Sequence, residues 1–153
     1  MASVMKRAVP VEVDLLILSF LSHFSWELLQ APLFSSLEGT GHFAGILICL
    51  RATLGDLGIA LAAFWCAAWL GDGRGWVSRP TLGTVIAFLG FGLVATISFE
   101  FVSTEILNRW SYGPGMPRLP IVGTGFAPLV QWLIVPALVL WYLNRLEKEK
   151  QRR

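Results

Sequence analysis

Charged residues are scarce in this sequence. Asp, Glu, Lys and Arg make up 14% of its 153 residues, whereas soluble domains carry about 25%. Hydrophobic residues make up 55%, and the mean hydropathy is +0.64. The shortage of charge argues against a soluble protein, and the length fits a single membrane domain that covers residues 1–153.

Cysteine and histidine are also rare, with two residues of each. Cys49 and Cys66 fall in one apolar segment, where about 26 Å of helix would separate them and prevent a disulfide. His42 is expected at the outer surface and His23 about 15 Å deeper, so the two do not readily share an ion. We therefore predict no metal site, with a site from His23 and carboxylates as a weaker alternative. The sequence identifies no cofactor.

Motifs of the common soluble enzyme classes are missing too. The stretch GDGRGW lacks the Lys-Ser/Thr pair of a phosphate-binding loop, and neither a G-x-S-x-G elbow nor a Cys–His pairing is present. Five of the twelve basic residues lie in the last nine positions, RLEKEKQRR. No groove of basic and aromatic residues accompanies them, so we expect no nucleic-acid partner and interpret residues 145–153 as a basic cytoplasmic tail.

Four apolar segments are present instead, and each is long enough to cross a bilayer, which takes about 20 residues. They cover residues 13–33, 43–70, 81–107 and 125–144. No small-x-small cleavage site closes the first segment, so we interpret it as a retained helix and not as a signal peptide. The sequence therefore predicts an all-α fold, an integral membrane four-helix bundle.

Basic residues outside the spans predict the orientation. With four spans, the N-terminus, the second loop and the C-terminus lie on the same side. That side carries nine Lys and Arg residues: Lys6, Arg7, Arg74, Arg79, Arg145, Lys148, Lys150, Arg152 and Arg153. The opposite side carries two, Arg109 and Arg118. Because cytoplasmic loops are enriched in Lys and Arg, both termini are expected in the cytoplasm.

Polar residues inside the spans follow a pattern. On the first span they recur at steps of three and four, which places them on one helix face. They are Ser19, Ser22, His23, Trp26, Glu27 and Gln30. The later spans add Arg51, Asp56, Glu100, Glu105 and Gln131, and at about 1.5 Å per residue all these groups lie near the midplane or in the outer half of the bilayer. Polar stripes in membranes face protein or a cavity, so we predict one polar pocket that opens outward.

This predicted pocket has more acids than bases. Glu27, Asp56 and Glu100 have one nearby cation, Arg51. We expect Arg51 to pair with Glu27 or Glu100, and a remaining acid, or His23, to exchange protons. A purely structural ion pair between helices is the alternative.

The outer loop, NRWSYGPGMPRLPIVGTG, is rich in Pro, Gly and aromatic residues, which favour a fixed shape. One interpretation is a lid that folds over the pocket. The other is an ordered loop that anchors Trp110 and Tyr112 at the membrane interface. The sequence leaves both interpretations open.

Several short motifs resemble a known family. They are WELLQAPLF, ATLGDLGIA, EILNRW and the spaced pattern Y...MP..P..G.G..P..QW...P. On these motifs the chain resembles, across all four spans, an uncharacterised family of small four-helix bacterial inner-membrane proteins. The resemblance implies a multi-pass protein of the bacterial inner (plasma) membrane and one constellation of residues: Trp26, Glu27, Gln30, Asp56, Glu105, Asn108, Trp110, Tyr112, Met116, Pro117, Gln131 and Trp132. The chain is also faintly similar to the sterol-isomerase and sigma-2-receptor superfamily, from which no residue role is carried over.

The first functional hypothesis is an acid–base enzyme or binder that acts on an apolar lipid or isoprenoid in the pocket. An acid in an apolar pocket can protonate an alkene, and a carboxylate or a Trp face can stabilise the resulting cation. The candidate acids and bases are Glu27, Asp56 and Glu100, with His23 as a relay. The candidate substrate-binding residues are Trp26, Gln30, Arg51, Glu105, Asn108, Trp110, Tyr112, Gln131 and Trp132.

Two alternatives stay open. In a small proton-coupled transporter or channel subunit, the same acids would carry protons. In a non-catalytic membrane assembly partner, Arg51 and the acids would lock helices together. The expected partners are membrane lipid, an apolar small molecule and, if the chain forms a homo-oligomer, further copies of itself.

Overall fold

The structure is a computed structural model, and it describes residues 9–71 and 73–152. Four α-helices account for most of these residues: α1 (Val11–Gln30), α2 (His42–Leu70), α3 (Leu82–Phe101) and α4 (Phe126–Arg152). Short helical turns join them: η1 (Ala31–Leu33), η2 (Ser35–Leu37), η3 (Gly73–Ser78) and η4 (Val102–Ile106), which continues α3 as a π-helical turn. The two described ranges contain no β-strand, so the prediction of an all-helical protein is confirmed.

Three helices are long and apolar enough to cross a membrane: α2, α3 together with η4, and α4. Their lengths and compositions are those of a membrane protein. The first helix, α1, is not among the three. It carries Glu12, Asp14, His23, Glu27 and Gln30 within its 20 residues, and these side chains lower its hydropathy. Its role as a fourth span stays a prediction.

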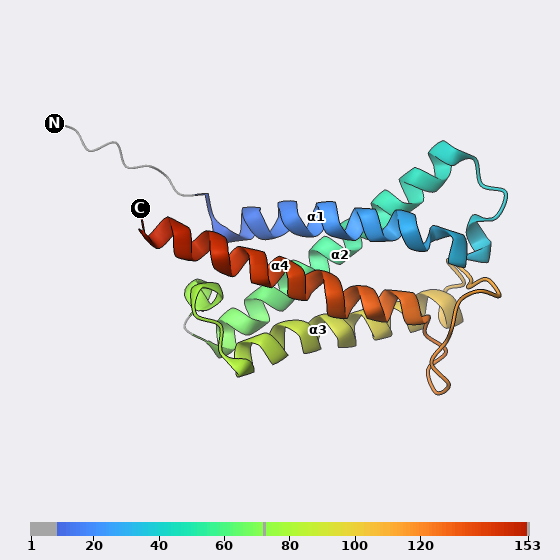
Figure 1. Ribbon diagram of the computed structural model, residues 1–153. Helices are drawn as coiled ribbons and strands as arrows, with labels where there is room; N and C mark the ends of the chain where they lie inside the picture. Colours follow the sequence, from blue (N-terminus) through green and yellow to red (C-terminus); the bar gives the residue numbers. More distant parts are fainter. Residues whose placement is uncertain (1–8, 72, 153) are drawn as a thin grey trace.

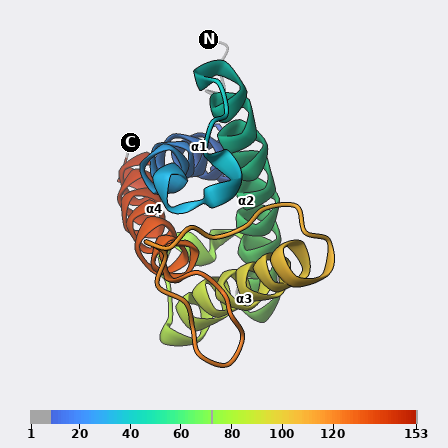
Figure 2. The same cartoon turned by 90° about the vertical axis from the view of Figure 1, so that its right-hand side faces the viewer.

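The helices run antiparallel, and α1 and α3 each pack on both α2 and α4 (Figure 1). The start of α1, the end of α4 and η3 lie at one end of the bundle, which we call the terminal end. The turns η1 and η2 and the loop 107–125 lie at the opposite end, which we call the loop end (Figure 2). In both views α2 and α3 diverge toward the loop end.

Local sequence signals explain where the helices begin and end. The α1 helix ends at Gln30, two residues before Pro32, and the chain turns into extended backbone at Phe34. Pro32 has no backbone N–H to donate to the carbonyl four residues before it, which accounts for the end of the helix at this point. At the start of α3, the Thr84 backbone N–H donates to the Thr81 hydroxyl at 3.2 Å, and the Thr81 N–H donates to the Thr84 hydroxyl at 3.0 Å. These bonds satisfy backbone donors that a helix start leaves free.

Apolar side chains fill the terminal half of the bundle. All four helices and η3 contribute to this cluster, which we call the apolar core: Val11, Leu15, Ala63, Phe64, Ala67, Ala68, Trp76, Val77, Phe88, Val135, Val139, Leu140 and Leu143. Each of these residues is buried. None of Glu27, Asp56, Glu100 and Gln131 belongs to this cluster.

The described part of the segment interpreted above as a basic tail, residues 145–152, is helical and contacts the terminal end of the bundle. The α4 helix continues past residue 144 to Arg152. The Asn144 side-chain amide donates to Val77 O at 2.6 Å, and the Lys150 ammonium lies 2.6 Å from an Asp14 carboxylate oxygen. These partners on η3 and α1 explain the longer helix, because they give the polar residues of the last turns fixed positions at the terminal end.

Candidate functional site

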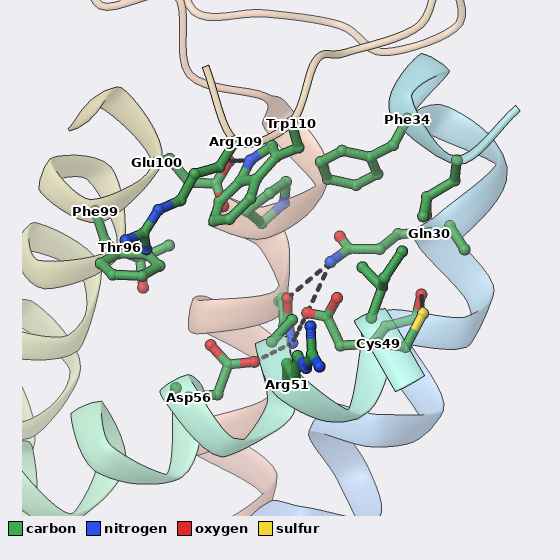
Figure 3. Close-up of a pocket in the computed structure, with 18 of the residues that line it drawn as sticks. Gln30, Phe34, Cys49, Arg51, Asp56, Thr96, Phe99, Glu100, Arg109 and Trp110 are labelled. Carbon is green, nitrogen blue, oxygen red and sulfur yellow. Dashed lines mark hydrogen bonds between the residues drawn. The ribbon is translucent and has the colours of Figure 1, made fainter. Parts of the chain in front are cut away.

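A cavity of about 520 Å³ lies in the loop half of the bundle (Figure 3). All four α-helices and the loop 107–125 contribute to its walls. Eight of the predicted site residues line it: Glu27, Gln30, Arg51, Asp56, Glu100, Trp110, Gln131 and Trp132. The structure thus brings together residues that are more than 100 positions apart in the sequence.

Gln131, on the second turn of α4, lies between an acid of α1 and an acid of α2. Its Nε2 atom is 3.2 Å from Glu27 Oε1 and 3.2 Å from Asp56 Oδ2. Its amide oxygen accepts a hydrogen bond from Gln30 Nε2 at 3.3 Å. One neutral amide, almost fully buried, therefore bridges the two carboxylates.

His23 lies behind these groups, fully buried. Its Nδ1 atom is 2.9 Å from Gln131 Nε2 and 3.3 Å from Asp56 Oδ2. When Nδ1 carries a proton, it donates to Asp56, and both Gln131 protons are free for the carboxylates. When Nδ1 is bare, it accepts from Gln131. In that state the proton sits on Nε2, which is buried and has no hydrogen-bond partner in the part of the chain that is described.

Asp56 receives donors from two other helices. Trp132 Nε1 donates to Oδ1 at 3.4 Å, while Oδ2 faces Gln131 and His23. The Trp132 side chain is fully buried and lies against the His23 ring, with 5.2 Å between the ring centroids. Asp56 on α2 is therefore held by α4 and faces α1.

Glu27 is positioned from its own helix. Gln30 Nε2 donates to Glu27 Oε1 at 2.9 Å, and Gln30 Oε1 accepts from Trp26 Nε1 at 3.1 Å. Residues three and four apart share a helix face, so the W-E-x-x-Q spacing builds this chain of bonds locally. Trp26 does not line the cavity but packs against the apolar core. Its hydrogen bond holds the Gln30 side chain in position from the side away from the cavity.

Glu100 has different partners from Glu27 and Asp56. It accepts hydrogen bonds from Trp110 Nε1, at 3.3 Å, and from the Tyr112 hydroxyl. Burial and the neighbouring Glu100 carboxylate raise the pKa of Tyr112 above its ordinary value, so the phenol keeps its proton and donates it. Glu100 therefore ties the end of α3 to the loop 107–125, whose Tyr112 ring also packs on Phe34, 5.4 Å between centroids.

Arg51 forms neither of the expected ion pairs, and this expectation was wrong. Its side chain lines the cavity and is exposed, and no carboxylate of residues 9–71 and 73–152 lies within ion-pair distance of it. Glu27 and Glu100 are bound instead by amide, indole and hydroxyl donors. Arg51 and Asp56 are five residues apart, so they point about 140° away from each other around α2.

Five of the predicted residues do not line the main cavity: His23, Trp26, Glu105, Asn108 and Tyr112. Glu105, Asn108 and Tyr112 line a second hollow of about 320 Å³ at the loop end. Asn108 adopts a φ of 48°, where the chain reverses after η4. Trp110 and Arg109 line both hollows, so the two are neighbours.

Sequence reasoning missed several residues of the site. Arg109 entered the prediction only as a loop charge, yet it lines the cavity. Phe34 stands at the end of the WELLQAPLF motif and forms part of the wall. Gly92 was overlooked as well: a Cβ atom there would lie 2.3 Å from Trp132 Cζ3, so the missing side chain makes room for the indole. A lone glycine in an apolar span gives no sequence signal for such a contact.

The residues in reach of a cofactor or substrate are those of the cavity wall. Within residues 9–71 and 73–152, no three His, Cys, Asp or Glu side chains are arranged to hold a metal ion. The polar atoms of the wall are carboxylate, amide, indole and guanidinium groups, which suit an organic ligand. Comparisons of the chain with models of protein families, with curated proteins and with solved structures found no match.

Proposed function

We propose that this protein is an acid–base enzyme of the bacterial inner membrane, with both termini in the cytoplasm, that acts on an apolar lipid such as an isoprenoid. The observation that carries the proposal is the pair Glu27 and Asp56, which share the Gln131 amide at the wall of the cavity. With a proton on one of the two acids, the pair presents a proton donor and a proton acceptor side by side. Such a pair can deliver a proton and accept another at the same place.

The cavity itself supports an apolar ligand. Its volume of about 520 Å³ is in the range of small-molecule sites, which is roughly 300–1,000 Å³. Apolar side chains from three helices and from the α1–α2 connection form much of the wall: Phe34, Leu37, Ile48, Ile59, Phe99 and Trp132. Glu27, Asp56 and Gln131 are gathered on one part of it, where the two acids can meet a reacting carbon while the rest of the ligand contacts hydrocarbon.

The chemistry that fits is proton addition and removal at carbon. The protonated carboxyl group of the pair would give its proton to one alkene carbon, which leaves the other alkene carbon cationic. The carboxylate would then take a proton from the next carbon along the chain, beside the cationic one. The double bond then shifts, and the pair ends with the same number of protons. Faces of Trp110 and Trp132 would stabilise the intermediate cation. His23 contacts Asp56 but does not line the cavity, so it would relay a proton without touching the ligand.

The apolar core supports this proposal over the transporter. A proton that crossed the bundle would need water or titratable groups in the terminal half. That half holds thirteen buried apolar residues of all four helices and η3 instead. Only a path formed between several copies of the chain would restore transport, and vesicle experiments on proton movement would detect it.

Deuterium exchange tests the proposal. The protein is placed in vesicles of bacterial lipid extract in D₂O, and the lipids are then analysed by mass spectrometry. The wild type is expected to place deuterium on carbon in one lipid class. Glu27→Gln and Asp56→Asn keep the shape of the side chains but remove the acids, and each is expected to slow the exchange by about 100-fold or more.

Glu149→Gln is the matched control, because it neutralises an exposed acid at the far end of α4. Its exchange should equal that of the wild type. An absence of deuterium with the wild type, or unchanged exchange in both acid variants, would refute the proposal. Acid variants that fail to accumulate in the membrane, beside an inactive wild type, would favour the assembly partner.

A further inference from the structure

Two arginines face the cavity without a counter-ion from the protein. Arg51 on α2 and Arg109 in the loop both line it, and both are exposed (Figure 3). Neither side chain forms an ion pair or a hydrogen bond with another described residue. Arg51 lies nine residues into α2, about 14 Å along the helix from its start at the loop end. A cation at that depth of a membrane is costly unless an anion meets it.

The carboxylates of the described chain do not supply this anion. Glu27, Asp56 and Glu100 already have neutral donors in the cavity wall. At the terminal end, Glu12 pairs with Arg74, while Asp14 and Glu147 pair with Lys150. Glu38, Glu105 and Glu149 form no ion pair with either arginine. Within residues 9–71 and 73–152 no acid therefore pairs with Arg51 or Arg109, and the anion is expected from outside these residues.

The cavity is exposed on the side between α2 and α3. Ile48 and Phe99, from these two helices, line it and are 43% and 47% exposed. Ala52 and Gly55 on α2 line it too and are also exposed. The two helices diverge toward the loop end, so this side faces the surrounding hydrocarbon if the bundle spans a bilayer (Figure 2). On the loop side, Arg109 and Trp110 form part of the wall.

We infer that the ligand is an anionic amphiphile, a phosphate or carboxylate on an apolar chain, which enters from the bilayer between α2 and α3. Arg51 and Arg109 bind its head group, and its chain lies in the cavity toward Glu27 and Asp56. The inference rests on the proposed function in one respect, that this cavity is the site where the ligand binds. It adds the charge of the ligand and the route by which the ligand arrives.

Binding of a matched pair of probes tests the charge. Geranylgeranyl phosphate and geranylgeraniol share one chain and differ in the head group, and inorganic phosphate alone represents a free anion. Their affinities for the detergent-purified protein are measured by native mass spectrometry. The phosphate lipid is expected to bind at least about tenfold more tightly than the alcohol, and inorganic phosphate only weakly. Equal affinity of lipid and alcohol overturns the inference, and so does phosphate that binds as tightly as the lipid.

Arginine variants locate the head group. Arg51→Gln and Arg109→Gln should remove the preference for the phosphate lipid, whereas Arg51→Lys should keep part of it. Arg145→Gln is the control with the same change of charge, because Arg145 is exposed on α4 and stacks on Trp141, away from the cavity. An unchanged preference in both arginine variants overturns the inference. A loss of thermal stability of ligand-free Arg51→Gln would also contradict it, since that result would assign Arg51 to an ion pair within the protein.

Two glycines of α2 test the route. A Cβ atom at Gly55 or at Gly58 would meet no other atom within 4 Å, so both positions accept a larger side chain. Gly55 lines the cavity and Gly58 does not. Gly55→Leu should slow the uptake of geranylgeranyl phosphate from vesicles several-fold, and Gly58→Leu should not. Equal rates in the two variants would exclude the opening between α2 and α3.

The two proposals fail separately. If carbon exchange depends on Glu27 but the probes show no preference for charge, the enzyme proposal stands and the anionic ligand does not. If the phosphate lipid binds through Arg51 but no exchange occurs, the site is a binding site for an anionic lipid and the enzyme proposal fails.

Discussion

Gln131 shows how a single neutral side chain can organise a charged site. Its amide nitrogen faces Glu27, Asp56 and His23, and its oxygen accepts from Gln30. An amide nitrogen has two protons, so it cannot satisfy all three of these partners at once. The protonation state of His23 therefore selects which of them Gln131 serves. In the proposed reaction, a proton that moves on or off His23 Nδ1 would therefore change the hydrogen bonds of Gln131 without moving a side chain.

Tyr112 gives a prediction for pH dependence at the residue scale. Its pKa is raised above the ordinary tyrosine value by burial and by the Glu100 carboxylate. The stabilisation from the protonated phenol is therefore complete below about pH 10, the unfolded value, and is lost as the pH rises toward the folded value. The chain has two tyrosines. We expect absorbance at 295 nm to show a phenolate step that appears only on alkaline unfolding and is missing in Tyr112→Phe. A Tyr112 that ionises in the native protein below pH 10 would contradict the assignment.

At the scale of elements, the contact of α3 with α4 depends on the absence of a side chain. The Trp132 indole lies over Gly92, and from there it reaches Asp56 on α2. The missing side chain at Gly92 thus permits both the close approach of α3 and α4 and the hydrogen bond from Trp132 to Asp56. A helix that gained a methyl group here would push the indole away from its acceptor.

Gly92→Ala is accordingly expected to destabilise the protein by about 1–3 kcal/mol, because an overfilled contact moves a buried ring. The matched control is Gly90→Ala on the same helix, where a Cβ atom would meet nothing within 4 Å. Alanine favours helix over glycine by about 0.5–1 kcal/mol, so the control should be neutral or more stable. Unfolding in mixed micelles measures both. A stable Gly92→Ala protein would mean that Trp132 has room to move.

The whole molecule is divided into two halves with different contents. The terminal half contains the apolar core and is closed at its end by polar contacts of Asn144 and Lys150. The loop half contains the cavity, the acids and the uncompensated arginines. In a membrane, such a division predicts a pocket that is open to one leaflet of the bilayer and to the aqueous phase on that same side, and closed to the other.

Cysteine labelling tests the orientation of these halves. In a protein with Cys49→Ala and Cys66→Ala, single cysteines are placed at Glu38, at the loop end, and at Glu149, at the terminal end; both positions are exposed. A membrane-impermeant maleimide should label Glu38→Cys in intact cells and Glu149→Cys only after permeabilisation, because the excess of basic residues predicts a cytoplasmic terminal end. The reverse pattern would invert the proposed topology.

The sequence alone determined the helices and the polar face of α1. Spacing along a helix is fixed by backbone geometry, so Trp26, Glu27 and Gln30 had to share a face, and Pro32 had to disturb the helix after them. The depth of a residue within its span follows from its position in the sequence, and it placed Gln131 at a depth compatible with those of Glu27 and Asp56. These features depend on a few neighbouring residues, which is why they could be predicted.

Only the tertiary structure decided which polar groups meet. The direction of a side chain around its helix depends on how that helix is rotated against its neighbours, and this rotation left Arg51 at the cavity wall without Glu27 or Glu100 as a partner. The fold of the loop gave Glu100 to Tyr112. Packing at η3 and α1 extended α4 to Arg152. Each of these outcomes depends on contacts between segments that are distant in the sequence. The free energy of such a contact depends on how two segments pack against each other, so neither segment alone predicts it.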